Sequence, residues 1–98
     1  MSQLIWSPRS GRDLAEIDAY LSERDPAAAA QMLRAIQVSA ARLAGFPRLG
    51  RPFGEPFRVI GVRKTPYLIL YRLRDGTIEI VRIRHARQDW PGAIEAEV

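Results

Sequence analysis

Two apolar stripes with helical spacing occupy the first half of the chain. After Ser7 and Pro8, the residues Leu14, Ile17 and Leu21 recur at intervals of three and four positions. This spacing places them on one face of an amphipathic helix. Serine is a favoured N-cap and proline suits the first helical position, so the sequence predicts that the helix begins at this Ser-Pro pair.

A second helix is predicted directly after the first. Asp25 can cap it, Pro26 can occupy its first position, and Gly45 and Pro47 end it. Its apolar stripe consists of Ala29, Met32, Ile36, Ser39, Ala40 and Leu43. Because only a short break separates the two patterns, they predict an αα-hairpin.

The rest of the chain is patterned for strands. Residues 3–7 are short, bulky and apolar and predict a first strand, whereas residues 48–56 are rich in glycine and proline and predict a loop. Residues 57–62, 67–73 and 77–86 predict three further strands. An Asp-Gly pair between the last two strands is a strong hairpin signal.

The last strand pattern changes its apolar face midway. Ile78 and Ile80 make one face apolar, but the same face continues with Arg82. The opposite face becomes apolar at Val81 and Ile83. A bulge, or a change in what covers the sheet, would explain this switch.

The element order β-α-α-β-β-β predicts an α+β fold in a single domain that covers residues 1–98. An N-terminal strand is followed by the αα-hairpin and by a three-stranded antiparallel meander. A sheet of this size must bury one face, and the hairpin is the available cover. We therefore expect helices packed on one face of a curled sheet.

The positive charge of the chain is concentrated in its second half. Residues 1–45 carry five Lys/Arg and five Asp/Glu, whereas residues 46–90 carry ten and four, within a total net charge of +4. This asymmetry favours an acidic partner, either nucleic acid or an acidic protein. A solvated basic surface explains a net charge of this size equally well.

Composition excludes several kinds of site. The chain has no cysteine and one histidine, which excludes disulfides, thiolate chemistry and a histidine-rich metal site. We expect no metal and no cofactor. The first residues lack the features of a signal peptide, and no apolar stretch is long enough to span a bilayer, so we expect a soluble cytoplasmic protein with no membrane partner.

Four features, in this order, resemble the RelE/ParE toxin superfamily of bacterial type II toxin–antitoxin modules. They are GRP after the second helix, PYLILYRL, the Asp-Gly hairpin and IEIVRIRHARQDW. The closing segment, with His85, Arg87 and Trp90, is similar to the ParE branch. The resemblance implies the RelE/ParE-like fold and a toxin that arrests growth, stabilises a plasmid or chromosome, and is neutralised by its antitoxin in a higher-order hetero-oligomer.

The resemblance implies two alternative activities. ParE-like members poison DNA gyrase on DNA, block replication and perform no chemistry of their own, whereas RelE-like members cut mRNA on the ribosome. RelE-like enzymes place a tyrosine near the C-terminus, but no tyrosine follows Tyr71 here, and Trp90 stands near that position. Metal-free RNA cleavage needs a base, an acid and cations, so we favour the gyrase alternative. If the chain is a ribonuclease, the catalytic candidates are His85, Arg63 and Arg82.

Two binding surfaces are expected. In VRIRHARQDW, residues 81–90, we expect the arginines to point outward toward gyrase and DNA, while Val81 and Ile83 hold the strand to the core. The predicted target-binding residues are Arg63, Lys64, Arg82, Arg84, Arg87 and Trp90. A groove between the helical hairpin and the sheet is expected to bind an acidic antitoxin segment through apolar anchors at helical spacing. The predicted anchors are Leu14, Ile17, Leu21, Met32 and Ile36.

Overall fold

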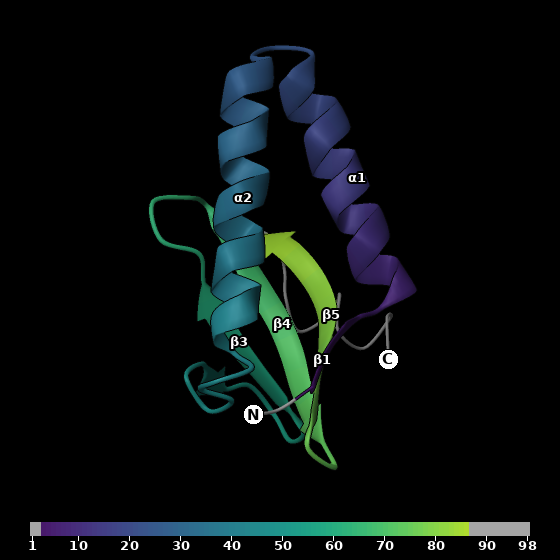
Figure 1. The fold of residues 1–98 in the computed structure, drawn as a ribbon, viewed down its shortest axis with the longest axis vertical. Helices are drawn as coiled ribbons and strands as arrows, with labels where there is room; N and C mark the ends of the chain where they lie inside the picture. The colour runs from purple at the N-terminus through teal and green to yellow at the C-terminus, as the bar shows by residue number, and fades with distance from the viewer. Residues whose placement is uncertain (1–2, 87–98) are drawn as a thin grey trace.

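The computed structural model describes residues 3–86, which form two helices on one face of a five-stranded sheet (Figure 1). The elements in chain order are β1 (Gln3–Trp6), α1 (Pro8–Ser22), α2 (Pro26–Arg42), β2 (Arg51–Pro52), β3 (Phe57–Gly61), β4 (Tyr67–Arg74) and β5 (Thr77–His85). The predicted α+β class, with its N-terminal strand, helical hairpin and closing meander, is confirmed.

Both helices begin where the capping signals predict. The Ser7 side chain accepts a hydrogen bond from the Ser10 backbone N–H at 3.0 Å, and the Asp25 side chain accepts one from Ala28 at 3.2 Å. In each helix a proline follows the cap at the first turn. Each cap satisfies one of the backbone donors that a helix leaves open at its N-terminus.

The strand order in the sheet is β1-β5-β4-β3-β2. β1 runs parallel to β5, whereas β2 through β5 are joined by antiparallel pairing. The prediction of a loop for residues 48–56 missed β2, in which Arg51 pairs with Val59 of β3. Two residues, one of them a proline, are too few to show the alternation that identifies a strand.

A bulge in β5 explains the change of apolar face. Leu70 of β4 pairs with Arg82, but the next residue, Tyr71, pairs with Ile80. Val81 is therefore the extra residue of β5. Because a bulge shifts the alternation of side chains by one position, Ile80 and Ile83 both reach the same core.

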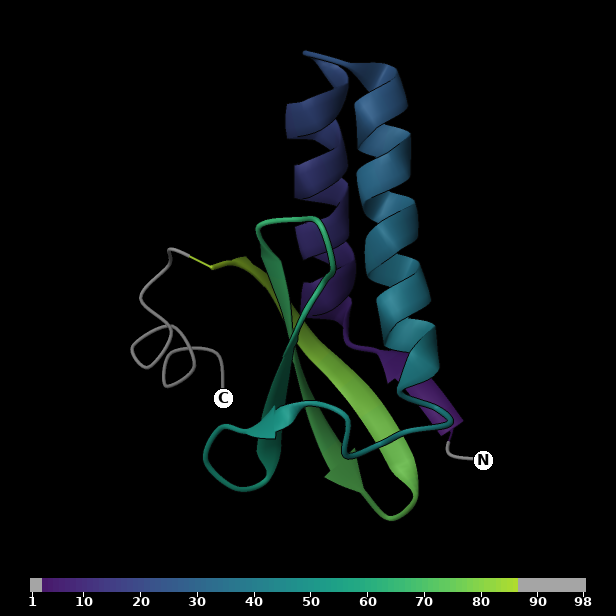
Figure 2. The ribbon, with the colours of Figure 1, turned by 90° about the vertical axis from the view of Figure 1, so that its left-hand side faces the viewer.

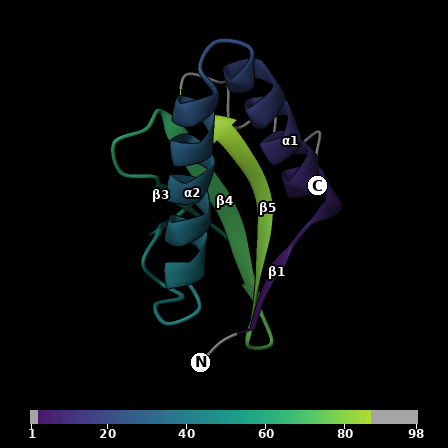
Figure 3. The ribbon, with the colours of Figure 1, turned by 45° about the horizontal axis from the view of Figure 1, so that its top comes forward.

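The core lies between the helical hairpin and the sheet. α1 lies along β5, α2 lies over β4, and the connection between the helices extends beyond the sheet (Figures 2 and 3). The buried core residues are Ile36, Ala40, Leu43, Val62, Ile69, Tyr71, Ile78, Ile80 and Ile83. A smaller cluster around Val59 and Leu70 occupies the opposite face of the sheet.

The loop after α2 is fixed to this core by a buried phenol. Tyr71 is fully buried, and its hydroxyl donates a hydrogen bond to the Pro47 carbonyl oxygen at 2.9 Å and accepts one from the Gly50 N–H at 2.8 Å. Arg58 Nη1 donates to the Gly50 carbonyl oxygen at 2.6 Å. These bonds fix the path of the chain from α2 into β2.

We expect Tyr71→Phe to lower the free energy of unfolding by about 1–3 kcal/mol, because it leaves the Gly50 N–H and the Pro47 carbonyl unpaired. Tyr20→Phe is the control, since Tyr20 is 58% exposed. Urea titrations of the two variants measure the difference. Equal losses in both variants would show that the Tyr71 hydroxyl does not fix the loop.

The same phenol predicts a loss of stability at alkaline pH. Burial raises the pKa of Tyr71 above its usual 10.0, and this effect exceeds the opposing effects of the Gly50 hydrogen bond and Arg58. Tyr71 therefore ionises at lower pH in the unfolded chain than in the folded protein. Its contribution to stability is complete below pH 10.0 and is lost as pH rises through the higher folded pKa. We expect the free energy of unfolding, measured by urea titration at pH values above 10.0, to fall less steeply with pH in Tyr71→Phe than in the wild type.

Candidate functional site

Arg82 is buried in an ion pair with Asp13 of α1. Arg82 Nε lies 2.8 Å from Asp13 Oδ2 and Arg82 Nη2 lies 3.1 Å from Asp13 Oδ1, and the two side chains are 6% and 7% exposed. The prediction that Arg82 points outward is therefore wrong. α1 crosses the edge of β5 beyond the end of β1 and brings a carboxylate within reach of the guanidinium.

The first turns of α1 complete the edge of β5 that β1 leaves open. Ser7 N donates to the Ile80 carbonyl at 3.0 Å, and Ser7 Oγ donates to the Val81 carbonyl at 2.9 Å. Asp13 Oδ2 also accepts the Ile83 N–H at 2.9 Å. These three bonds satisfy edge groups that would otherwise be available to another strand, so α1 is fixed to β5 by side chains as well as by packing.

A cleft of about 370 Å³ lies between α1 and the ends of β4 and β5. Its lining includes Arg9, Glu16, Tyr20, Tyr67, Arg84 and His85. The rings of Tyr67 and His85 meet edge to face, with their centroids 5.8 Å apart. Burial, and then repulsion from the Tyr20 phenolate, raises the pKa of Tyr67 above 10.0, so Tyr67 is protonated at neutral pH.

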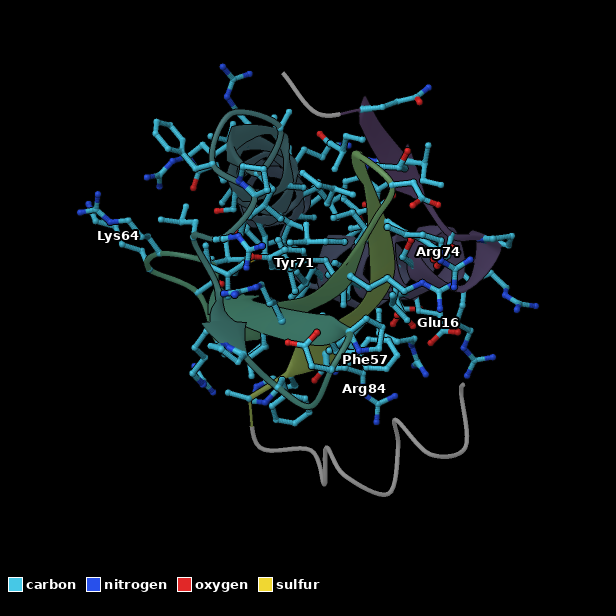
Figure 4. All side chains as sticks on the ribbon, turned by 90° about the horizontal axis from the view of Figure 1, so that it is seen from below. Glu16, Phe57, Lys64, Tyr71, Arg74 and Arg84 are labelled. Carbon is cyan, nitrogen blue, oxygen red and sulfur yellow. The ribbon has the colours of Figure 1, made fainter. Side chains whose placement is uncertain are left out.

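The predicted cations Arg63 and Lys64 lie in the exposed turn between β3 and β4. This turn and the end of β5 are at the same end of the sheet, because Tyr67 pairs with His85. Lys64 nevertheless projects outward, well apart from Arg84 (Figure 4). These candidates therefore share one end of the molecule without forming one compact cluster.

Two predicted target-binding residues, Arg87 and Trp90, lie outside the described residues. The segment VRIRHARQDW is described only as far as Ala86. Val81 and Ile83 contact the two clusters on the two faces of the sheet, as predicted for residues that hold this strand to the core.

Two other sheet arginines bind groups of the protein itself. Arg72 Nε forms an ion pair with Glu79 Oε1 on the neighbouring strand, and both side chains are 24% exposed. Arg58 binds the carbonyl oxygens of the loop after α2, that of Gly50 at 2.6 Å and that of Arg48 at 3.4 Å. With the pair formed by Arg82, three arginines of the described sheet have structural partners.

Most of the predicted antitoxin anchors lie in the core or pack against it. Ile36 is 0% exposed, so the prediction that it contacts an antitoxin directly is wrong: α2 packs this residue against the sheet. Leu14, Ile17 and Met32 are half-buried against the same core, and Leu21 is half-buried near the end of α1. The helical stripe that the sequence shows therefore serves first to cover the sheet.

The described residues give no indication of a metal site. Residues 3–86 contain no group of three or more His, Asp or Glu side chains placed to hold a metal ion. Within the same residues, neither helix is long and apolar enough to cross a membrane.

The fold and sequence match those of known toxins. Residues 4–90 match the family described as "ParE toxin of type II toxin-antitoxin system, parDE". The chain is 38% identical to Toxin RelE2 of Caulobacter vibrioides over 88% of this chain and 97% of that one. It is 40% identical to the putative toxin Y4kP of Sinorhizobium fredii over 91% and 93% of the two chains.

A solved structure has the same fold. A chain of the chromosomal ParDE toxin–antitoxin system from P. aeruginosa superposes with a TM-score of 0.78 at 22% identity, over 87% of this chain and 96% of that one. A structural match at 22% sequence identity shows a shared fold alone. The match to the toxin family, in contrast, rests on the sequence and covers nearly all the described residues. The chain therefore belongs to the ParE toxin family of type II toxin–antitoxin systems.

Proposed function

We propose that this toxin inhibits DNA gyrase, blocks replication and performs no chemistry of its own. The observation that carries the proposal is that three arginines of the sheet are bound to acceptors of the protein itself. Arg82 binds Asp13, Arg72 binds Glu79, and Arg58 binds loop carbonyls. Metal-free RNA cleavage requires cations that can stabilise the charge developing on a phosphate, and these three guanidinium groups already have protein acceptors.

The proton-transfer groups support the same proposal. Tyr67 has a raised pKa, which makes its phenol a poorer general base at neutral pH. The sequence has no tyrosine after Tyr71. The His85 and Tyr67 rings meet edge to face, which agrees with a structural role for His85. Binding to a protein–DNA target needs no acid–base pair.

A RelE-like ribonuclease is the second candidate. The cleft beside α1 brings His85, Tyr67 and Arg84 together, and a relative that is 38% identical is named RelE2. In that alternative His85 is the acid or base, and Arg84 or Arg63 holds the phosphate. Arg82 would contribute by positioning β5 because its guanidinium is buried.

Within the proposal, the antitoxin and the gyrase–DNA complex are the partners, and the toxin acts in the cytoplasm where that complex lies. Arg63, Lys64, Arg84, Arg87 and Trp90 are the proposed target contacts. The toxin and antitoxin together form a higher-order hetero-oligomer.

The cellular response on induction separates the two candidates. We expect incorporation of labelled thymidine to stop and the cells to form filaments, while incorporation of labelled methionine continues through the first minutes. Co-expression of the antitoxin should prevent both effects and serves as the control. An immediate stop in methionine incorporation, with thymidine incorporation continuing, would instead identify the ribosome as the target. His85→Ala should leave the replication block intact.

A further inference from the structure

The loop between α2 and β2 presents two large apolar side chains to solvent. Phe46 is 63% exposed and Leu49 is 43% exposed. A turn with a 3.0 Å hydrogen bond from Leu49 N to the Phe46 carbonyl holds them together. They border a shallow hollow of about 420 Å³, also lined by Gly45, Pro47 and Arg48. Their exposed surface contributes nothing to the core beneath the loop.

This loop is held in place from below. The Tyr71 hydroxyl binds both Pro47 and Gly50, and Arg58 binds the Gly50 carbonyl. Phe46 and Leu49 are therefore presented on a backbone that is already ordered. A preorganised loop loses less conformational entropy when it binds a partner than a mobile one does.

The charged residues within this stretch of the chain have one sign, although Asp75 of the turn between β4 and β5 borders a hollow that Pro47 and Arg48 also line. No Asp or Glu occurs between Asp25 and Glu55, a stretch whose charged residues are Arg34, Arg42, Arg48 and Arg51. Arg42, Arg48 and Arg51 are exposed. Since complementary charge steers and orients association, the segment that covers this surface should be acidic.

We propose that this loop and its flanking residues form a docking site for an acidic segment of the antitoxin that carries large apolar side chains. The proposed docking surface consists of Arg42, Phe46, Arg48, Leu49 and Arg51. Exposed apolar side chains with arginines near them in the chain suit a protein partner, because protein–protein interfaces combine a buried apolar centre with arginine contacts. Nucleic acid would use the arginines but gain little from Leu49. The proposal depends on the toxin–antitoxin family alone and holds whether the toxin acts on gyrase or on the ribosome.

The proposal predicts a large loss of antitoxin affinity in the double variant Phe46→Ser/Leu49→Ser. Calorimetric titration with the purified cognate antitoxin should show binding weaker by about 30-fold or more, because two apolar contacts at the centre of an interface are lost. Arg48→Glu should weaken binding by about 5–10-fold at low salt and less at high salt. Ile5→Ser is the matched control, because Ile5 has the same 43% exposure as Leu49 but lies on β1. The antitoxin affinity of this variant should be unchanged.

Thermal melts verify that the variants fold, as expected for exposed positions. Hydrogen exchange on the wild-type proteins gives a second readout: amides of residues 45–50 should exchange more slowly in the complex. Wild-type affinity in the double variant, an equal loss in Ile5→Ser, or unchanged exchange would each overturn the proposal. A further result would also overturn it. If Arg48→Glu no longer bound a short DNA duplex while the double variant still bound the antitoxin, the loop would be a nucleic-acid surface.

Discussion

We expect Asp13→Ala to lower the free energy of unfolding by about 3–5 kcal/mol. The substitution leaves the Arg82 charge buried without the carboxylate that binds both its Nε and Nη2. It also removes the acceptor of the Ile83 N–H. The helix α1 would then keep only the Ser7 hydroxyl as a side-chain attachment to β5, and the folded toxin should be scarce in cells.

Two further variants show whether the charge is the cause. Asp18→Ala, at an exposed position of the same helix, should cost no more than about 0.5 kcal/mol. The double variant Asp13→Leu/Arg82→Met should recover much of the loss, because apolar residues of similar size often replace a buried ion pair at little cost. Urea unfolding measures all three. If Asp13→Ala and Asp18→Ala prove equally stable, the buried pair does not fix α1 to the sheet.

Gly50→Ala should be the second most damaging change. A Cβ atom at this position would lie 2.7 Å from both the Tyr71 hydroxyl oxygen and the Val59 carbonyl oxygen. Real contacts are not that short, so either the Tyr71 side chain or the β3 backbone must move. We expect a loss of about 3 kcal/mol from overpacking and from the broken Tyr71 hydrogen bonds.

Gly11→Ala is the matched control, since nothing lies within 4 Å of its added Cβ in α1. It should raise stability by about 0.5–1 kcal/mol, as alanine does in a helix interior. Adding Tyr71→Phe to Gly50→Ala should restore little, because the Val59 carbonyl still blocks the Cβ. Full recovery in that double variant would show that the strand backbone is free to move and that the close approach is unimportant.

The helices and the hairpin were predictable because their signals are local. A Ser-Pro pair and an Asp-Pro pair mark both helix starts, and an Asp-Gly pair marks the turn between β4 and β5. The bulge could also be inferred, because the apolar face of 77–86 changes within the strand. In each case the evidence lies within a few residues of the feature.

The partner of Arg82 could not be inferred from that pattern. Alternation along a strand assigns Arg82 to a face, but the bulge at Val81 and the passage of α1 across the strand edge decide what the side chain meets. Asp13 is 69 positions away in the sequence. One local signal existed: Asp13 lies four residues before Ile17, so it falls on the apolar side of α1, where an acidic residue needs a buried partner.

The burial of Ile36 could not be inferred for a related reason. The stripe that includes Ile36 was visible in the sequence, but an amphipathic stripe does not reveal whether the protein's own sheet or a partner covers it. The sheet covers it here. Phe46 and Leu49 lie in a stretch rich in glycine and proline, where periodicity gives no information, and their exposure follows from the Tyr71 contacts that fix the loop.

The most direct test of the proposed function is a supercoiling reaction with purified components. DNA gyrase, relaxed plasmid and ATP are incubated with the toxin, and toxin already bound to its antitoxin is the control. A parallel reaction contains ribosomes, mRNA and the same toxin. We expect free toxin to stop supercoiling, antitoxin-bound toxin to leave it unchanged, and the mRNA to remain intact. Unchanged supercoiling at saturating toxin, with mRNA cut on the ribosome and the cutting lost in His85→Ala, would contradict it.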